Sequence, residues 1–195
     1  AQNGAARDAA ELALLLQERG LGGRGEDLAA RLDRWRGDRS CRAEASRKLA
    51  ARWAKLAGGT NAAPAGNPSL GILLAEAFPD NIAKRRDASG EHWLTAGGRG
   101  LRVDPASPLA RSAWLAVGDA QGDAKGARIT GAIAIEDADI AGWLGHRIER
   151  RPTLRWIADE RRVEALLDQR LGAILVARGS DPAPDPQAIR DFVVA

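Results

Sequence analysis

Apolar residues recur every three to four positions through the first third of the chain, which is the spacing of one face of an α-helix. The pattern predicts helices over residues 4–19 and 26–37, and a third that begins at residue 38 or 40 and ends at residue 57. The loops between them are short and contain glycine. Three short-looped amphipathic helices are expected to form a small bundle or half of one.

The pattern changes after a small, polar, Pro-punctuated stretch over residues 58–68, which we interpret as a linker. Residues 69–78 are predicted to form a short helix. Beyond it the apolar period shortens from about 3.6 to about 2, which indicates β-strands. Five short strands are predicted, over residues 81–86, 92–96, 100–103, 113–118 and 127–135.

A short helix over residues 137–144 interrupts the strands, which resume over residues 146–158 and 161–178. The last segment has helical propensity too, but the topology favours a strand with Gly172 as a bend or bulge. Strands followed by a helix and two more strands are typical of the OB-fold. We therefore expect an α+β protein in which a helical bundle fragment precedes an OB-like antiparallel β-barrel with an inserted short helix.

The expected organisation has four parts: residues 1–57 as the bundle, 58–68 as the linker, 69–180 as the barrel, and 181–195 as a Pro-rich exit and the start of a C-terminal helix. Apolar residues make up 45% and charged residues 28%, which excludes wholesale disorder. No apolar run approaches the roughly 20 residues that cross a bilayer, and the N-terminus lacks a signal pattern. We expect a cytoplasmic protein with no membrane partner.

Cysteine and histidine are too few for a disulfide or a structural zinc site, because Cys41 is the single cysteine and His92 and His146 are the only histidines. Neither histidine has a Ser or Cys partner placed to suggest a catalytic triad. The sequence therefore predicts no catalytic residues, no metal site and no cofactor within this segment. The chain also lacks methionine, which indicates a piece of a longer polypeptide.

Positive charge is concentrated at the front of the chain. Residues 1–60 hold 12 Lys or Arg against 8 Asp or Glu, whereas the remaining 135 residues hold 17 against 18. The third predicted helix carries six cations against Glu44 alone, and Arg47 and Arg52 are its candidate nucleic-acid contacts. A solvated helix face is the alternative reading of the same pattern.

A second cationic group lies on the first predicted barrel strands and comprises Lys84, Arg85, Arg86, Arg99 and Arg102. If these strands pair, the five cations converge on one edge. Gly97, Gly98 and Gly100 would then let N–H groups face phosphate oxygens. An ordinary hairpin turn with solvated arginines remains the alternative, and the ending that defines a P-loop is absent.

Base stacking is the remaining chemistry to consider, because the chain holds six tryptophans. Trp35, Trp53, Trp114 and Trp143 fall within apolar patterns and are predicted to be core. Trp93 and Trp156 stand in polar company. Trp93, beside the basic strand, is our candidate base platform.

Three phrases, FPDNIAKRR, LTAGGRG and VDPASPLARSAWLAVGD, together resemble the C-terminal region of bacterial HrpB-type DEAH-box ATP-dependent helicases. The front end resembles the tail of that family's helicase-associated helical domain. Asn81 and Gly97 stand where the family has arginine and asparagine. The resemblance extends over nearly the whole chain.

The resemblance implies an accessory region that grips single-stranded RNA, or DNA, beside the parent chain's RecA-like motor domains. ATP and Mg²⁺ would belong to those domains, since neither the ATP-binding loop nor the Asp-Glu-Ala-His box occurs here. The segment is thus expected not to be catalytic alone. By the same resemblance the basic strand and turn supply backbone contacts to the nucleic acid. The alternative is a protein-interaction module that docks the motor domains or a partner without touching nucleic acid.

Overall fold

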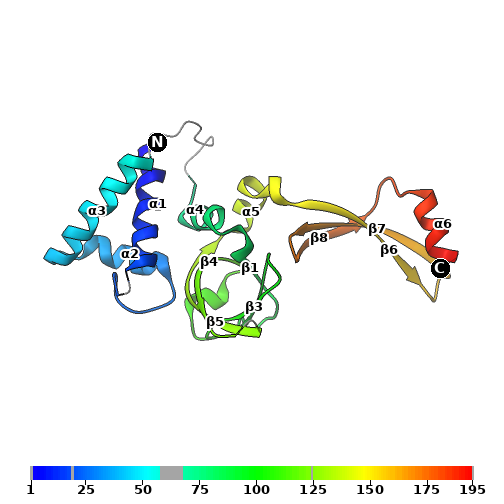
Figure 1. The fold of residues 1–195 in the computed structure, drawn as a ribbon. Helices are drawn as coiled ribbons and strands as arrows, with labels where there is room; N and C mark the ends of the chain where they lie inside the picture. Colours follow the sequence, from blue (N-terminus) through cyan, green and yellow to red (C-terminus); the bar gives the residue numbers. More distant parts are fainter. Residues whose placement is uncertain (1, 19, 58–67, 124, 195) are drawn as a thin grey trace.

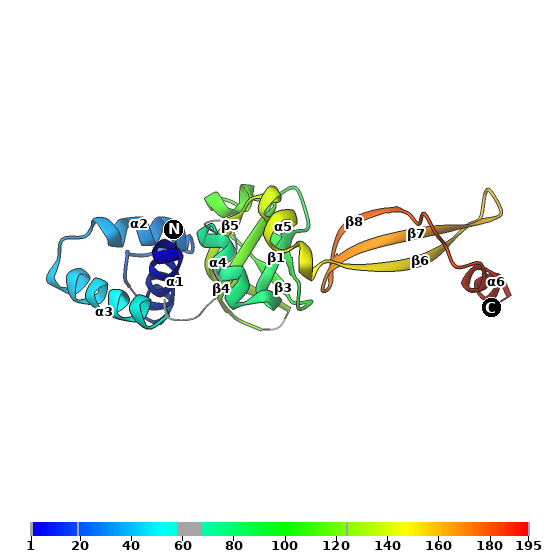
Figure 2. The same cartoon turned by 90° about the horizontal axis from the view of Figure 1, so that it is seen from above.

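The computed structural model describes residues 2–18, 20–57, 68–123 and 125–194. A helical bundle, a β-barrel and a projecting β-sheet follow one another along an elongated molecule (Figures 1 and 2). The mixed α+β content confirms the predicted fold class. Apart from Pro68, the predicted linker lies outside the described residues. None of the described helices is long and apolar enough to cross a membrane.

The bundle consists of α1 (Gln2–Gln17), α2 (Leu28–Gly37) and α3 (Cys41–Ala57), as the apolar spacing predicts. Asp27 caps α2, since its carboxylate accepts a hydrogen bond from the backbone N of Ala30 at 3.1 Å. The buried face of α2 carries Leu28, Leu32 and Trp35. Each of the three helices therefore buries one apolar stripe in the core that they share.

Five strands close into a barrel after the short helix α4 (Leu70–Ala77). They are β1 (Ile82–Arg85), β2 (His92–Thr95), β3 (Gly100–Arg102), β4 (Trp114–Gln121) and β5 (Lys125–Ile135). The order is β1-β2-β3-β5-β4, and β4 pairs with β1 to complete the circuit. Closure removes the free strand edges that an open sheet would expose.

The barrel differs from the expected one in two respects. β3 and β5 run parallel, so the barrel is not wholly antiparallel. The predicted helix, α5 (Asp137–Trp143), lies directly after β5 as the sequence predicts, but all five barrel strands precede it, so it is not inserted into the barrel. The barrel is complete before α5 begins, because β5 spans 11 residues and pairs with β3 near its start and with β4 beyond.

The strands beyond α5 form a separate sheet, so the prediction that they belong to the barrel is wrong. They are β6 (Glu149–Ile157), β7 (Arg162–Leu171) and β8 (Ile174–Ser180), paired in that order and antiparallel. The single strand predicted over residues 161–178 is in fact two, and Gly172 lies in the turn between them. Helix α6 (Pro186–Val194) follows.

Two glycines bring the bundle onto the barrel. A Cβ at Gly118 would lie 2.8 Å from the Leu16 side chain, and one at Gly131 would lie 3.3 Å from Leu28. The backbone N of Ala132 also donates to the Glu26 oxygen at 2.8 Å. The bundle, α4 and the outer wall of β4 and β5 therefore share one apolar core, although residues 58–67 separate the bundle from α4 in sequence.

The tight β7–β8 turn attaches the projecting sheet to the barrel. Gly172 has a φ of 56°, and the backbone N of Ala173 donates to the Ala96 oxygen at 2.8 Å. The Lys84 ammonium adds a bond of 2.9 Å to the Leu175 oxygen. Beyond this junction the sheet extends away from the barrel and carries α6 at its far end (Figures 1 and 2).

Candidate nucleic-acid interface

Helix α3 has one anchored face and one free face. On the anchored face Ala43 and Ala50 are buried, and the Ser46 hydroxyl accepts a hydrogen bond from Trp35 Nε1 at 2.9 Å. That hydroxyl in turn donates to the Ala43 oxygen at 2.9 Å. Because the buried indole and hydroxyl satisfy each other, the rotation of α3 about its axis is fixed.

The free face of α3 presents Lys48, Arg52 and Lys55, spaced by four and three residues, and all three side chains are exposed. Within the described part of the chain, none of them has an ion-pair or hydrogen-bond partner. Arg42 pairs only loosely with Glu18, at 3.9 Å. We call Lys48, Arg52 and Lys55 the α3 triad; it is a cluster of exposed cations that form no ion pair with any carboxylate in the described part of the chain.

Arg47 does not belong to this surface. Its side chain is half-buried, and its guanidinium donates to the Trp35 oxygen at 2.8 Å, at the C-terminal end of α2. A cation at that position favours the negative end of a helix. The structure therefore places Arg52 and Arg47, both predicted contacts, in different environments.

Three of the five predicted barrel cations are engaged within the protein. Lys84 donates to the Leu175 oxygen at 2.9 Å and lies 5.1 Å from the centre of the Trp114 ring. Arg85 donates to the Ala110 oxygen at 3.2 Å, and Arg102 forms an ion pair with Glu91. Their side chains stabilise the barrel and its contacts, which sequence patterning could not show.

Arg86 and Arg99 are exposed and have no side-chain partner among the described residues. They lie at opposite ends of the β1–β2 pair. At one end the backbone N of Arg86 donates to the His92 oxygen at 2.8 Å. At the other end lies the turn that holds Arg99, where the backbone N of Ala96 donates to the Ile82 oxygen at 2.7 Å. The predicted convergence of five cations on one edge is therefore wrong. It required all five side chains to point the same way from a short ladder.

The glycine turn also has a structural use. The backbone N of Gly97 donates to the Asp80 oxygen at 2.8 Å, and that of Gly98 to the Thr95 oxygen at 2.9 Å. Gly98 needs its φ of 86°, which side-chain-bearing residues rarely adopt. These two N–H groups are consequently satisfied without a phosphate.

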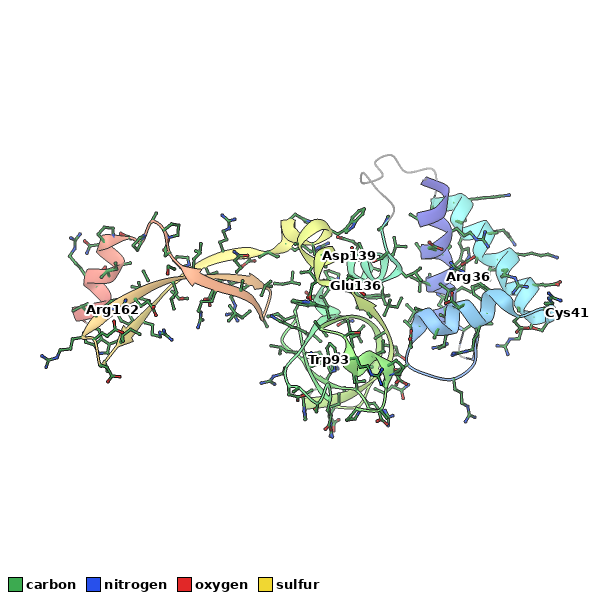
Figure 3. All side chains as sticks on the ribbon, turned by 180° about the vertical axis from the view of Figure 1, so that it is seen from behind. Arg36, Cys41, Trp93, Glu136, Asp139 and Arg162 are labelled. Carbon is green, nitrogen blue, oxygen red and sulfur yellow. The ribbon has the colours of Figure 1, made fainter. Side chains whose placement is uncertain are left out.

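Trp93 cannot be a base platform, because its side chain fills the barrel interior and is 0% exposed (Figure 3). Its Nε1 donates to the Gly90 oxygen at 2.7 Å. Trp156 on β6 is instead 49% exposed. Both have polar neighbours in sequence; only the strand pairing reveals which of them faces into a closed barrel.

Electrostatics on the barrel and sheet are dominated by local pairs. Hydrogen bonding from Ser89, then from His92 and Gly90, lowers the pKa of Asp87 from 3.8 to about 2. The Arg178 guanidinium lowers the pKa of Asp168, whose carboxylate it bonds at 2.6 and 2.9 Å. No cluster of three or more potential metal ligands occurs among the described residues. The exposed cations of the α3 triad, by contrast, form no ion pair with a carboxylate of the described residues.

Comparison with solved structures gives the fold a context. The E. coli DExH-box NTPase HrpB superposes with a TM-score of 0.73 and 22% identity over 93% of this chain, and a second structure, of the Escherichia coli DEAH/RHA helicase HrpB, gives 0.70 and 20% over 93%. This chain has the fold of a segment of HrpB. It spans only 21% and 22% of those two chains.

No family model matches the sequence, and no curated protein matches it. The superposition on HrpB confirms, at the level of the fold, the resemblance that the three sequence phrases indicated. At this level of sequence identity the comparison shows the shared fold, and the helicase activity is a property of HrpB. Its transfer to this chain is a matter of proposal.

Proposed function

We propose that this chain is an accessory region of an ATP-dependent RNA helicase and that it holds single-stranded RNA beside motor domains that lie outside it. The observation that carries the proposal is the α3 triad, whose three exposed cations lack carboxylate partners among the described residues. The shared fold with HrpB supports a helicase context. ATP and Mg²⁺ would be bound by the motor domains of the parent chain.

The barrel has a supporting role in the proposal. Its five strands and their order are compatible with an OB-like barrel, a type that binds single strands along a basic groove. Of the cations predicted there, Arg86 and Arg99 keep free side chains and serve as secondary phosphate contacts. Lys84, Arg85 and Arg102 act mainly through the internal bonds described above.

The proposal is tested by titrating fluorescently labelled single-stranded RNA against the protein at a series of salt concentrations. Each phosphate contact to a single strand contributes about −0.7 to the slope of log K against log salt. Changing Lys48, Arg52 and Lys55 together to Gln should therefore make the slope shallower by about 2 and weaken binding at low salt.

A matched control removes the same charge from exposed arginines that already have carboxylate partners. Arg7, Arg155 and Arg162 pair with Glu11, Glu164 and Glu160. Changing these three to Gln should leave the slope unaltered. Absence of binding by the wild-type protein at low salt would refute the proposal, and equal slopes for the two triple variants would refute the α3 interface.

A protein-interaction module that docks the motor domains is the second candidate. It is favoured by the internal engagement of Lys84, Arg85 and Arg102, and by Leu56, which is 81% exposed at the end of α3. This candidate predicts that Leu56→Ser abolishes co-purification with separately expressed motor domains while the α3 triple variant retains it. Retention of co-purification by Leu56→Ser would refute this candidate.

A further inference from the structure

The two faces of the projecting sheet differ in chemistry. Strand alternation and the pairing register place one set of side chains together, which we call the Trp156 face. Its members are Arg150, Pro152, Leu154 and Trp156 of β6, Val163, Ala165, Leu167 and Gln169 of β7, and Ala177 and Gly179 of β8. These strand residues form an apolar strip that contains one cation and no carboxylate.

The opposite face of the sheet carries several ion pairs. Arg155 pairs with Glu164, Arg151 with Glu149, and Arg178 with the buried carboxylate of Asp168. Each exposed arginine there is neutralised by a neighbour. The positive charge of this face is therefore balanced by carboxylates of the same sheet.

On the Trp156 face the arginine is free. Arg150 is exposed, and the part of the chain that the structure describes offers it no partner. Arg161, also exposed and unpaired among the described residues, lies in the turn just beyond the far end of β6. At about 3.3 Å of rise per residue, Arg150 and Trp156 lie about 20 Å apart along the strand.

Trp156 itself lies near the far end of the sheet, close to the turn that Arg162 marks in Figure 3. Trp156 is 49% exposed, the largest exposure of any tryptophan among the described residues. A half-exposed tryptophan on the surface of a sheet leaves part of its aromatic side chain open to solvent. Such rings stack on nucleobases whatever their sequence.

We propose that the Trp156 face is a second single-strand site, on which a base stacks on Trp156 while Arg161 contacts a phosphate beside it and Arg150 contacts a phosphate farther along the strand. This inference rests on the proposed function. The occupant is a polyanion with flat apolar bases, because it alone matches both an apolar strip and the unneutralised cations at its two ends. An apolar protein partner would use the strip and leave the cations without a role.

The test compares the wild-type protein with four single-residue variants of the full chain in binding a labelled single-stranded oligo-uridylate. Trp156→Ala should weaken binding by about 5- to 150-fold, the loss expected for one stacked base. Trp156→Phe keeps a ring that can stack and should retain most of the affinity. Circular dichroism checks that each variant folds, because replacing a half-exposed side chain should leave the secondary structure unchanged.

A test of charge and its control come from two arginines of β6. Arg150→Gln should weaken binding and make the salt slope shallower by about 0.7, whereas Arg155→Gln, on the opposite face, should change neither. Quenching of tryptophan fluorescence by the oligonucleotide should be smaller in Trp156→Phe than in the wild type. Loss of a merely structural contact would not produce this pattern.

The outcomes separate this inference from the proposed function. If the wild-type protein binds no single strand, both fail. If it binds and the α3 triple variant is weaker, while Trp156→Ala and Arg150→Gln match the wild type, the proposed function stands and the Trp156 face is overturned as an RNA site. If Trp156→Ala and Arg150→Gln are both weaker and Arg155→Gln is not, the inference is supported.

Discussion

Replacing Gly172 by alanine should loosen the junction between the barrel and the projecting sheet. Gly172 has a φ of 56°, and a Cβ added there would lie 2.3 Å from the Ala96 oxygen. That oxygen accepts the bond from the Ala173 backbone N at 2.8 Å, so the methyl group and this hydrogen bond cannot both keep their places.

The magnitude follows from these two effects. A left-handed conformation costs a residue with a side chain about 1–2 kcal/mol, and loss of a typical hydrogen bond costs about 0.5–1.5 kcal/mol. The free energy of unfolding should therefore fall by about 2–3 kcal/mol. Because the Lys84 bond to Leu175 lies at the same junction, limited proteolysis should cleave more readily near the β7–β8 turn.

Urea unfolding followed by circular dichroism measures the change in stability, with Gly179→Ala as the control. Gly179 lies on β8, its φ is not in the positive range, and a Cβ there would meet no atom within 4 Å. Equal unfolding midpoints and proteolysis rates for the two variants would refute the reasoning that the turn attaches the sheet.

Three further outcomes are expected. Trp93→Ala should lower the free energy of unfolding by about 3–5 kcal/mol, measured by urea denaturation, because it empties the barrel interior; a near-neutral result would contradict the buried position. Ser46→Ala should cost about 1–3 kcal/mol in the same assay, since Trp35 Nε1 loses its acceptor, and an unchanged midpoint would mean that the indole finds another. The Asp87 carboxyl should titrate with a pKa of about 2 by NMR. Because folding lowers this pKa, the carboxylate's stabilising contribution is fully present above 3.8 and is lost as the pH falls through about 2; a measured pKa near 3.8 would contradict its bonds to Ser89 and His92.

The sequence by itself determined the elements. Helical spacing of apolar residues predicts α1 to α3, and the switch to a period of two predicts the strands of the barrel within a few residues, because these periods follow from local backbone geometry. The excess of cations on α3 is also a local property, and it marked Arg52 before any contact was known. The phrases between Phe78 and Asp119 pointed to the fold that HrpB shares.

Tertiary structure alone decided which strands close the barrel and which side chains remain free. Pairing between β3 and β5 joins residues far apart in sequence, and it releases the strands after α5 into a separate sheet. Closure of the barrel turned Trp93 inward, the separate sheet left Trp156 exposed, and the junction of that sheet with the barrel brought the Leu175 oxygen to Lys84. A side chain's partners depend on what the rest of the chain brings beside it, and no local period encodes that.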